Sequence, residues 1–317
     1  MAMRSLIALA IAMTSFISVG GAEAADKVRV AIAAVYVPFA PIYVAEELGY
    51  YKENNLEVEP TVYRGGGPAQ EAMAAGAADI LTNSPMGAAL AISKGVKQKI
   101  VAAGGTVTPG GWHLIARKDS GIKSMEDLNG KKVGVSGKGS TSDFFALWAA
   151  KNANVSIQTI PLGGNGLLPA IKNKQVDAII LWPAFSFRAL QDDTLSDLVN
   201  LGKVMGPVVP DSVVASEEMI EKRPDVLRRY LQALLKAVDY MQKNEEWTKK
   251  YIAKYAGESD PVVLDRAYRD VIMQIRLDGM IERDWIKNSL ELMKLVTPEE
   301  TPSIDAVFTS KFLPVKQ

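Results

Sequence analysis

Side chains that could hold a small solute stand where an apolar run of the chain gives way to the start of a helix. Tyr36 follows the β-branched run 27–33, and Ser140 lies in a glycine-containing loop that opens a helix. Strand-to-helix loops are where α/β sheets bind ligands, and a helix N-terminus attracts anionic groups. We therefore expect the solute to be bound by loop residues of this kind, namely Tyr36, Gly66, Gly67, Asn83, Ser84, His113, Ser140, Thr141, Asn165 and Trp182.

Helix capping is the alternative explanation for the hydroxyl and amide side chains in these loops. Ser, Thr and Asn in front of a helix cap it more often than they bind a ligand. A cap satisfies one of several free N–H groups, so capping and binding are compatible. The surrounding pattern occurs twice in the chain, and for this reason we keep Asn83, Ser140 and Thr141 as candidates.

Trp182 and His113 are aromatic candidates for which the sequence offers more than one role. Trp182 follows residues 178–181, which already supply a buried strand, so its indole is predicted to form a wall of a cleft. His113 is the only histidine and follows Trp112, which fits a structural role as well as that of a ligand donor. Both residues are therefore kept as candidates.

Composition excludes several kinds of chemistry. The chain has no cysteine and one histidine, which leaves no disulfide, thiolate metal site, cysteine nucleophile or histidine-based metal site. Lys and Arg together number 36, as do Asp and Glu, and this balance argues against nucleic-acid binding through counterion release. The glycine-rich loop 163–166 lacks the Gly-Lys-Ser/Thr ending of a phosphate-binding loop. We therefore expect no metal, cofactor or nucleic-acid partner.

One pattern of glycine turn, short helix, acidic residue, apolar strand and proline-initiated helix occurs twice. The two copies span residues 65–95 and 162–190. The same spacing separates Asp79 from Pro85 and Asp177 from Pro183. Two similar α/β units are therefore predicted, with a ligand cleft between them.

The order of apolar runs and turn residues predicts that one α/β lobe is interrupted by the other. Strands are expected at 27–33, 56–62, 80–82 and 100–103 in the first lobe and at 133–135, 157–160 and 178–181 in the second. Residues 213–215 are predicted to return to the first lobe, and an amphipathic helix is expected after Pro224. We expect two crossover strands between the lobes, with the first lobe at 25–116 and 209–317 and the second at 117–208.

The first residues are typical of a secretory signal peptide. Arg4 supplies a positive charge, residues 6–19 form a short apolar stretch, and Ala-Glu-Ala at 22–24 fits a cleavage site. We expect residues 1–24 to be removed, because an uncleaved membrane anchor, the alternative, would need a longer apolar stretch. The chain has no cysteine to carry a lipid, so the mature protein is expected in the periplasm.

Several segments resemble the nitrate/sulfonate/taurine-type solute-binding proteins of ABC importers, and they occur in the same order. These segments are APIYVAEELGYY at 40–51, LEVE at 56–59, AAG at 74–76 followed by Ala78 and Asp79, KDSGI at 118–122, DLNGKKV at 127–133 and QVDA at 175–178. The resemblance covers nearly the whole chain after the signal peptide. It implies a type-II periplasmic-binding-protein fold, a monomer whose two lobes close on a solute and deliver it to the membrane subunits of an ABC permease.

The resemblance implies a binding protein rather than an enzyme, with two alternatives. The first is an enzyme like the thiamine-pyrimidine synthases, which this family also resembles. Those enzymes use a cysteine-rich motif and active-site histidines, whereas this chain has no cysteine and one histidine. The second is a sensory receptor that passes its liganded state to a membrane kinase.

The resemblance also suggests the kind of solute, since the family takes sulfonates, taurine, nitrate and other small compounds. The chain offers no evident arginine clamp, because Arg64 and Arg188 only neighbour the expected cleft. We therefore expect a small anionic organic solute. It would be either a monoanion held by helix N-termini or an aromatic acid between Tyr36 and Trp182.

Overall fold

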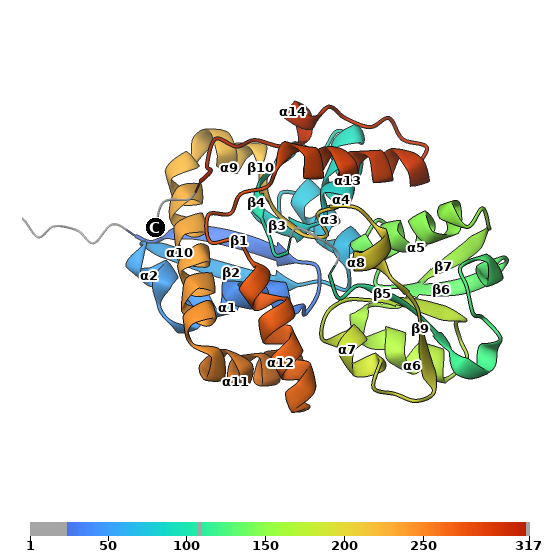
Figure 1. The fold of residues 1–317 in the computed structure, drawn as a ribbon. Coiled ribbons are helices and arrows are strands. Elements are labelled where there is room, and N and C mark those ends of the chain that lie inside the picture. The colour runs from blue at the N-terminus through green and yellow to red at the C-terminus, as the bar shows by residue number, and fades with distance from the viewer. Residues whose placement is uncertain (1–23, 107–109, 315–317) are drawn as a thin grey trace, which may run out of the picture.

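The computed structural model describes residues 24–106 and 110–314, which form two α/β lobes (Figure 1). Each lobe contains a five-stranded mixed sheet with helices packed on it. The first lobe contains the blue strands and the orange and red C-terminal helices, and the second lobe contains the green and yellow segment. The expected architecture of two α/β lobes is therefore confirmed.

The first sheet combines four strands from the first third of the chain with one strand from much later. Its order is β2-β1-β3-β10-β4, with β1 parallel to β2 and β3, and β10 antiparallel to β3 and β4. The strands are β1 (Asp26–Ile32), β2 (Leu56–Val62), β3 (Ile80–Asn83), β4 (Gln98–Ala103) and β10 (Ser212–Ser216). The accompanying helices are η1 (Val37–Phe39), α1 (Ala40–Glu47), α2 (Tyr50–Glu53), α3 (Gly66–Ala74) and α4 (Pro85–Ser93).

The second sheet has the order β7-β6-β8-β5-β9, with β6 parallel to β7 and β8, and β5 antiparallel to β8 and β9. Its strands are β5 (His113–Arg117), β6 (Lys131–Val135), β7 (Ile157–Pro161), β8 (Ala178–Leu181) and β9 (Leu195–Asn200). Its helices are η2 (Lys118–Ser120), η3 (Glu126–Leu128), α5 (Thr141–Asn152), η4 (Gly164–Gly166), α6 (Leu167–Lys172), α7 (Phe185–Ala189) and α8 (Leu201–Val204). The two sheets thus share one topology, in which β3 and β8, the strands of the repeated sequence pattern, occupy equivalent third positions.

The boundary expected at residue 116 differs from the observed strand pairing. β5 pairs with β8 and β9 and therefore belongs to the second sheet, not to the first lobe at 25–116. The chain leaves the first sheet at the end of β4, at Ala103, and joins the second sheet at His113. Glycines mark the turn in the sequence, but the sheet that a following apolar strand joins is decided by long-range pairing. The return through residues 213–215 is confirmed, because β10 lies between β3 and β4.

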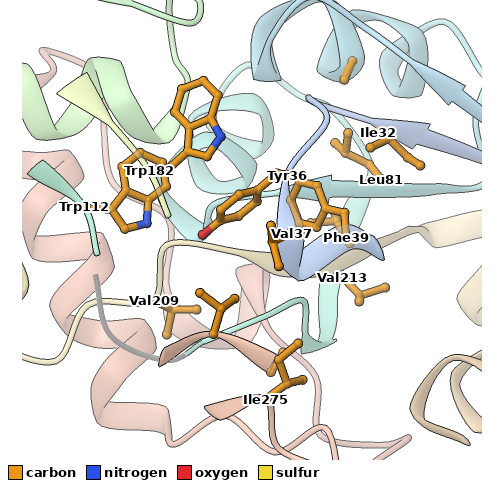
Figure 2. Packing of buried hydrophobic residues seen from close by; sticks show 14 of the residues in the cluster. Ile32, Tyr36, Val37, Phe39, Leu81, Trp112, Trp182, Val209, Val213 and Ile275 are labelled. Carbon is orange, nitrogen blue, oxygen red and sulfur yellow. The ribbon is translucent and has the colours of Figure 1, made fainter. Parts of the chain in front are cut away.

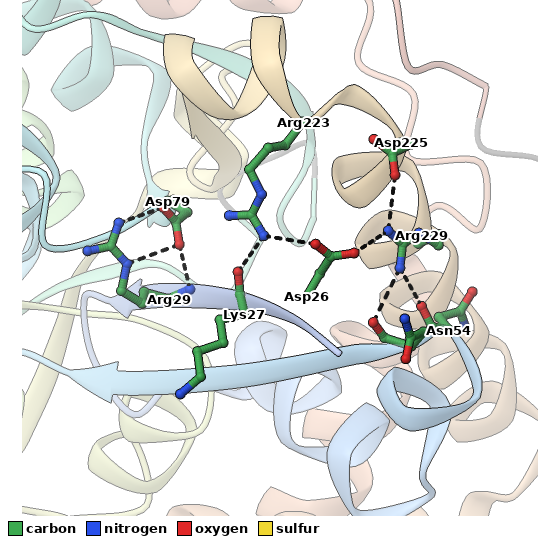
Figure 3. A network of polar contacts seen from close by, with 9 residues as sticks. Asp26, Lys27, Arg29, Asn54, Asp79, Arg223, Asp225 and Arg229 are labelled. Atoms are coloured by element: carbon green, nitrogen blue, oxygen red, sulfur yellow. Dashed lines mark hydrogen bonds and ion pairs between the residues drawn. The ribbon is translucent and has the colours of Figure 1, made fainter. Parts of the chain in front are cut away.

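The repeated aspartates link two neighbouring strands in each sheet, β3 to β1 in the first and β8 to β6 in the second. Asp79 Oδ2 accepts a hydrogen bond from the backbone N–H of Arg29 on β1 at 2.8 Å, and Asp177 Oδ2 accepts one from the N–H of Lys132 on β6 at 2.8 Å. The Arg29 guanidinium also binds Asp79, with its Nη2 2.6 Å from Oδ1 (Figure 3). Burial acts against ionisation, but the hydrogen bonds from Arg29 lower the pKa of the Asp79 carboxyl below its usual value. The acidic residue in the sequence repeat therefore has a structural role.

The C-terminal helices attach mainly to the first lobe. They are α9 (Glu217–Lys222), α10 (Pro224–Lys243), α11 (Glu245–Ala256), α12 (Pro261–Asp270), η5 (Ile272–Gln274), α13 (Arg283–Val296) and α14 (Ile304–Val307). The long α10 packs on α1 and α2 through the apolar face that the sequence predicts. Arg229 fastens α10 to the start of β1 through Asp26, at 2.6 Å (Figure 3). In contrast, α13 contacts α4 of the first lobe and α5 of the second.

The expected signal peptide lies outside the described residues, except for Ala24. Among the residues that the structure describes, no helix has both the length and the apolar character needed to cross a membrane.

Replacing each repeated aspartate by alanine should destabilise the protein to different degrees. Asp79→Ala removes hydrogen bonds to the backbone and to the guanidinium of Arg29, whereas Asp177→Ala removes one bond to a backbone N–H. At ~1.5–3 kcal/mol for a charged partner, we expect losses of about 3 kcal/mol and about 1–2 kcal/mol in the free energy of unfolding. Urea titration at neutral pH measures both, and equal losses would contradict this account of Arg29.

Candidate functional site

A small cavity lies between the lobes, beside the two links that join them. The outgoing link runs from β4 to β5, and the returning link leads into β10. Water centres can occupy about 40 Å³ of it. One water needs roughly 10–15 Å³ by this measure, so the cavity takes a few waters or a solute of a few non-hydrogen atoms. Both lobes and both links contribute to the lining, which consists of Ala33, Ala34, Tyr36, Phe39, Gly66, Thr82, Asn83, Trp112, Ser136, Ser140, Thr141, Ser142, Trp182 and Asp211.

Aromatic rings form much of the cavity wall (Figure 2). The ring centroid of Tyr36 lies 6.0 Å from that of Trp112 and 6.4 Å from that of Trp182, and the two indoles are 5.9 Å apart. Phe39 packs edge-to-face on Tyr36 at 5.0 Å. The Tyr36 hydroxyl and the two indole N–H groups are buried and have no hydrogen-bond partner among the described residues. Such orphaned groups are rare in proteins. The Tyr36 hydroxyl has the Asp211 carboxyl and the Trp112 indole as polar neighbours.

Three serines that line the cavity from the second lobe hydrogen-bond to one another. The Oγ atoms of Ser136, Ser140 and Ser142 form a triangle of hydrogen bonds with edges of 2.9–3.0 Å. Thr141 donates to the carbonyl oxygen of Pro210 at 3.0 Å and so ties α5 to the returning link. These hydroxyls are held in place at the cavity edge, and the single histidine is not part of their network. The cluster therefore has the features of a polar wall rather than of an activated nucleophile.

The N-terminus of α5, the anion site expected from the sequence, already carries a carboxylate of the protein itself. Asp143, in the first turn of α5, accepts a hydrogen bond from the N–H of Gly139 at 2.9 Å through Oδ2. Ser140 caps the helix by accepting from the N–H of Asp143 at 3.3 Å. A negative side chain at this position uses the positive end of the helix dipole. The α5 N-terminus therefore offers much less attraction to an anionic solute than the sequence suggested.

Asp211 is the charged side chain among the described residues that line the cavity, and it is 4% exposed. Its Oδ2 has no hydrogen-bond partner in the described part of the chain. Burial raises the pKa of the Asp211 carboxyl to about 7, and the nearby hydroxyl of Tyr36 acts against this rise. The cavity thus contains an acid that sits between its neutral and charged forms near neutral pH.

A wider outer cavity adjoins the inner one, with which it shares Ala33 and Ala34. Its volume is about 340 Å³, and its lining includes Arg64, Asn165 and Phe185. Residues of both lobes line this outer cavity. The arginine nearest to the expected cleft therefore lines the outer cavity and not the inner one.

Six of the expected binding residues line the inner cavity, namely Tyr36, Gly66, Asn83, Ser140, Thr141 and Trp182. The other four lie elsewhere. Ser84 caps α4 by accepting from the N–H of Gly87 at 3.1 Å, and Asn165 lines the outer cavity. His113 is buried on β5 with its Nδ1 2.9 Å from Asp197 Oδ1, so the structural role is the one observed. Gly67 faces the other lobe.

The glycines at 65–67 bring the backbones of the two lobes together. A Cβ atom on Gly65 would stand 3.0 Å from the carbonyl oxygen of Ser136, and one on Gly67 would stand 2.9 Å from that of Lys138. Gly65 also has a φ of 122°, which side-chain-bearing residues rarely adopt. The glycine loop is therefore an interlobe contact that requires the absence of side chains.

Sequence reasoning missed Asp211, Ser136, Ser142, Phe39 and Thr82 as lining residues. For Asp211 there was a signal, because a lone acidic residue interrupts the apolar segment Val-Val-Pro-Asp-Ser-Val-Val at 208–214. Trp112 was noted only as the neighbour of His113. Its ring lines the cavity because β5 belongs to the second sheet, which the expected boundary at 116 placed elsewhere.

The match to a family model spans residues 37–247 and bears the description NMT1/THI5 like. The chain belongs to the NMT1/THI5-like family. A Brucella abortus (strain 2308) protein that is named as a binding protein is 26% identical over 259 residues, covering 80% of this chain and 78% of the relative. The resemblance seen in the sequence is thus confirmed at the level of the family.

Two further matches illustrate the range of this family and its fold. The alkanesulfonate-binding protein SsuA from Xanthomonas axonopodis pv. citri, solved bound to MOPS, superposes with a TM-score of 0.75 at 17% identity over 90% of this chain and 99% of that one. At this identity the likeness shows the periplasmic-binding-protein fold. The 4-amino-5-hydroxymethyl-2-methylpyrimidine phosphate synthase of Schizosaccharomyces pombe is 25% identical over 265 residues, covering 78% of this chain and 75% of the relative. The chain is therefore similar both to binding proteins and to an enzyme.

Asp211→Asn should stabilise the solute-free protein, and increasingly so as the pH rises. The folded-state pKa of Asp211 is about 7, above the ordinary value of 3.8, so the folded protein retains a proton that the unfolded chain releases. The stability that this provides is complete below about pH 4 and is lost as the pH rises through about 7. At about 1.4 kcal/mol per pKa unit, the variant should gain a few kcal/mol over the wild type by pH 8.

Thermal unfolding from pH 4 to pH 8 measures this effect, with Asp193→Asn as the matched control at an exposed acid. A stability difference between Asp211→Asn and the wild type that stays constant with pH would contradict the assignment.

Proposed function

We propose that the protein is a solute receptor of an ABC importer, which captures a small molecule between its lobes and hands it to a membrane permease. The observation that carries the proposal is the cavity at the lobe interface, whose lining includes Tyr36, Trp112, Trp182 and Asp211, each with a buried polar atom that lacks a hydrogen-bond partner among the described residues. Both lobes contribute these groups, so only the closed arrangement assembles them. Binding by lobe closure is the mechanism that this arrangement favours.

A binding role fits the side chains better than the synthase activity named for the fission yeast relative. The chain has no cysteine, and its one histidine is engaged with Asp197 on β5. Among the described residues, no three His, Asp or Glu side chains are grouped in a way that could hold a metal ion. The hydroxyls at the cavity have no base beside them among its lining residues, apart from the carboxylate of Asp211. These side chains can bind a solute, and we propose no catalytic step for them.

The location and partners of the protein belong to the same proposal. We infer that residues 1–24 direct export and are removed, and that the mature protein acts as a monomer in the periplasm. The name of a Brachyspira hyodysenteriae relative, 25% identical over 258 residues, includes the words ABC transporter periplasmic binding protein. An intact mass of the exported protein that still contained residues 1–24 would contradict the cleavage.

Two linked experiments test the receptor function. A thermal-shift screen of small organic ions and heterocycles identifies a solute, because binding raises the free energy of unfolding by RT ln(1 + [L]/Kd). Uptake of the labelled solute is then compared in cells with and without the gene. Loss of uptake supports transport, whereas unchanged uptake with a lost transcriptional response would favour the sensory alternative.

Gly67→Ala should weaken solute binding by obstructing lobe closure. The added methyl would stand 2.9 Å from the carbonyl oxygen of Lys138, a contact that forces the two backbones apart. Reduced population of the closed state lowers the apparent affinity in proportion, and we expect a loss of about tenfold or more. Gly206→Ala is the matched control, since its Cβ would meet no atom within 4 Å.

Calorimetric titration with the solute from the screen gives the affinities, and small-angle scattering reports closure. A Gly67→Ala protein that binds and compacts like the wild type would show that the glycine loop does not limit closure.

A further inference from the structure

We propose that the solute is a small organic cation that carries N–H groups and a nearby oxygen acceptor, bound by Asp211 inside the box formed by Tyr36, Phe39, Trp112 and Trp182. This inference rests on the proposed receptor function and adds the chemical class of the ligand. It reverses the charge that the sequence led us to expect.

The charges of the inner cavity favour a cation. Asp211 is acidic, and no lysine or arginine is among the described residues that line the cavity. Arg64 lines the outer cavity, and Lys138 is exposed and donates its ammonium hydrogen bond to Thr159. A buried charge is stable only when an opposite charge and hydrogen bonds compensate it. An anionic solute would place a second negative charge beside Asp211, whereas a cation would neutralise it.

The arrangement of the rings suits a cation as well. The planes of Phe39, Trp112 and Trp182 meet that of Tyr36 at 89°, 70° and 82°. These rings contact Tyr36 edge-to-face at centroid distances of 5.0–6.4 Å, and all four rings line the cavity. The face of an aromatic ring attracts a cation, and the attraction grows when water is excluded. In this cavity the side chains of Tyr36, Trp112 and Trp182 are almost completely buried.

The orphaned polar atoms define the hydrogen bonds that the solute has to make. Oδ2 of ionised Asp211 can only accept, so its partner is an N–H or O–H, either of the neighbouring Tyr36 or of the solute. The indole N–H groups can only donate, so Trp182 is served by an acceptor of the solute and Trp112 by such an acceptor or by the Tyr36 hydroxyl. A protonated amine with a hydroxyl or carbonyl oxygen a few bonds away meets both requirements. The cavity of about 40 Å³ limits such a solute to a few non-hydrogen atoms.

Three probes of similar size separate the contributions of charge and acceptor. Ethanolammonium carries both an ammonium and a hydroxyl group, ethylammonium lacks the hydroxyl group, and ethylene glycol lacks the charge. Methanesulfonate and nitrate serve as anionic probes. Each is titrated calorimetrically, at neutral pH and up to millimolar concentrations, into the wild-type protein, Asp211→Asn, Trp182→Leu and the exposed control Asp193→Asn.

We expect ethanolammonium to bind more tightly than ethylammonium, and ethylammonium more tightly than ethylene glycol or either anion. Asp211→Asn should weaken ethanolammonium binding by at least about tenfold, because a charge-assisted hydrogen bond becomes a neutral one. Trp182→Leu should weaken it through loss of a ring face, and Asp193→Asn should leave it unchanged.

Three results would overturn the cation proposal. They are the absence of binding by both ammonium probes, preferential binding of an anion, and ammonium binding that Asp211→Asn leaves intact. Preferential anion binding would leave the receptor function standing, because that function is judged separately by uptake and closure. If uptake of the solute did not depend on the gene, the receptor function would be contradicted. The measured preference of the cavity among the probes would still stand.

Discussion

The lobes meet where two backbone segments touch without side chains between them, and this contact determines what the cavity can hold. Gly65 and Gly67 approach the carbonyl oxygens of Ser136 and Lys138 so closely that a methyl group would not fit. Because the lobes come this near, the space that remains between them is small. Burial of Asp211, Tyr36 and the two tryptophans follows from that closeness. In a wider cleft the same residues would be wet, and neither the raised pKa nor the orphaned groups would arise.

The position of Asp211 depends on how the two links between the lobes cross. Its backbone carbonyl accepts a hydrogen bond from the N–H of Gly104, the first residue after β4, at 3.2 Å. A Cβ on Gly104 would stand 2.8 Å from the carbonyl carbon of Ser212, so the outgoing and returning links pack backbone to backbone. Thr141 of the second lobe holds the neighbouring Pro210. The carboxylate therefore lies at the point where both lobes and both links meet.

Features that depend on nearby residues could be predicted from the sequence. The spacing of Asp79 and Pro85, repeated at Asp177 and Pro183, gave two equivalent strand-to-helix junctions, and the apolar stripe of α10 gave a buried helix. Six of ten expected binding residues line the cavity, because strand ends and helix starts have local signatures. The other features of the site depend on contacts between residues that are far apart in the sequence. The sheet that β5 joins, the occupation of the α5 N-terminus by Asp143 and the burial of Asp211 arise only when segments far apart in the chain pack together.

Electroneutrality connects the acid, the rings and the solute. Without a solute, Asp211 near neutral pH can hold a proton, so the closed cavity need not bury a net charge. With a cationic solute, the carboxylate ionises and the ion pair is again neutral. The proton and the cation are thus alternative occupants of one buried acid, and capture of the solute at or below pH 7 releases a proton. An arginine at this place would lack such an exchange, because it would keep its charge in the empty cavity. A weak acid in an aromatic box is therefore suited to a receptor whose lobes close around a cation and open again to release it.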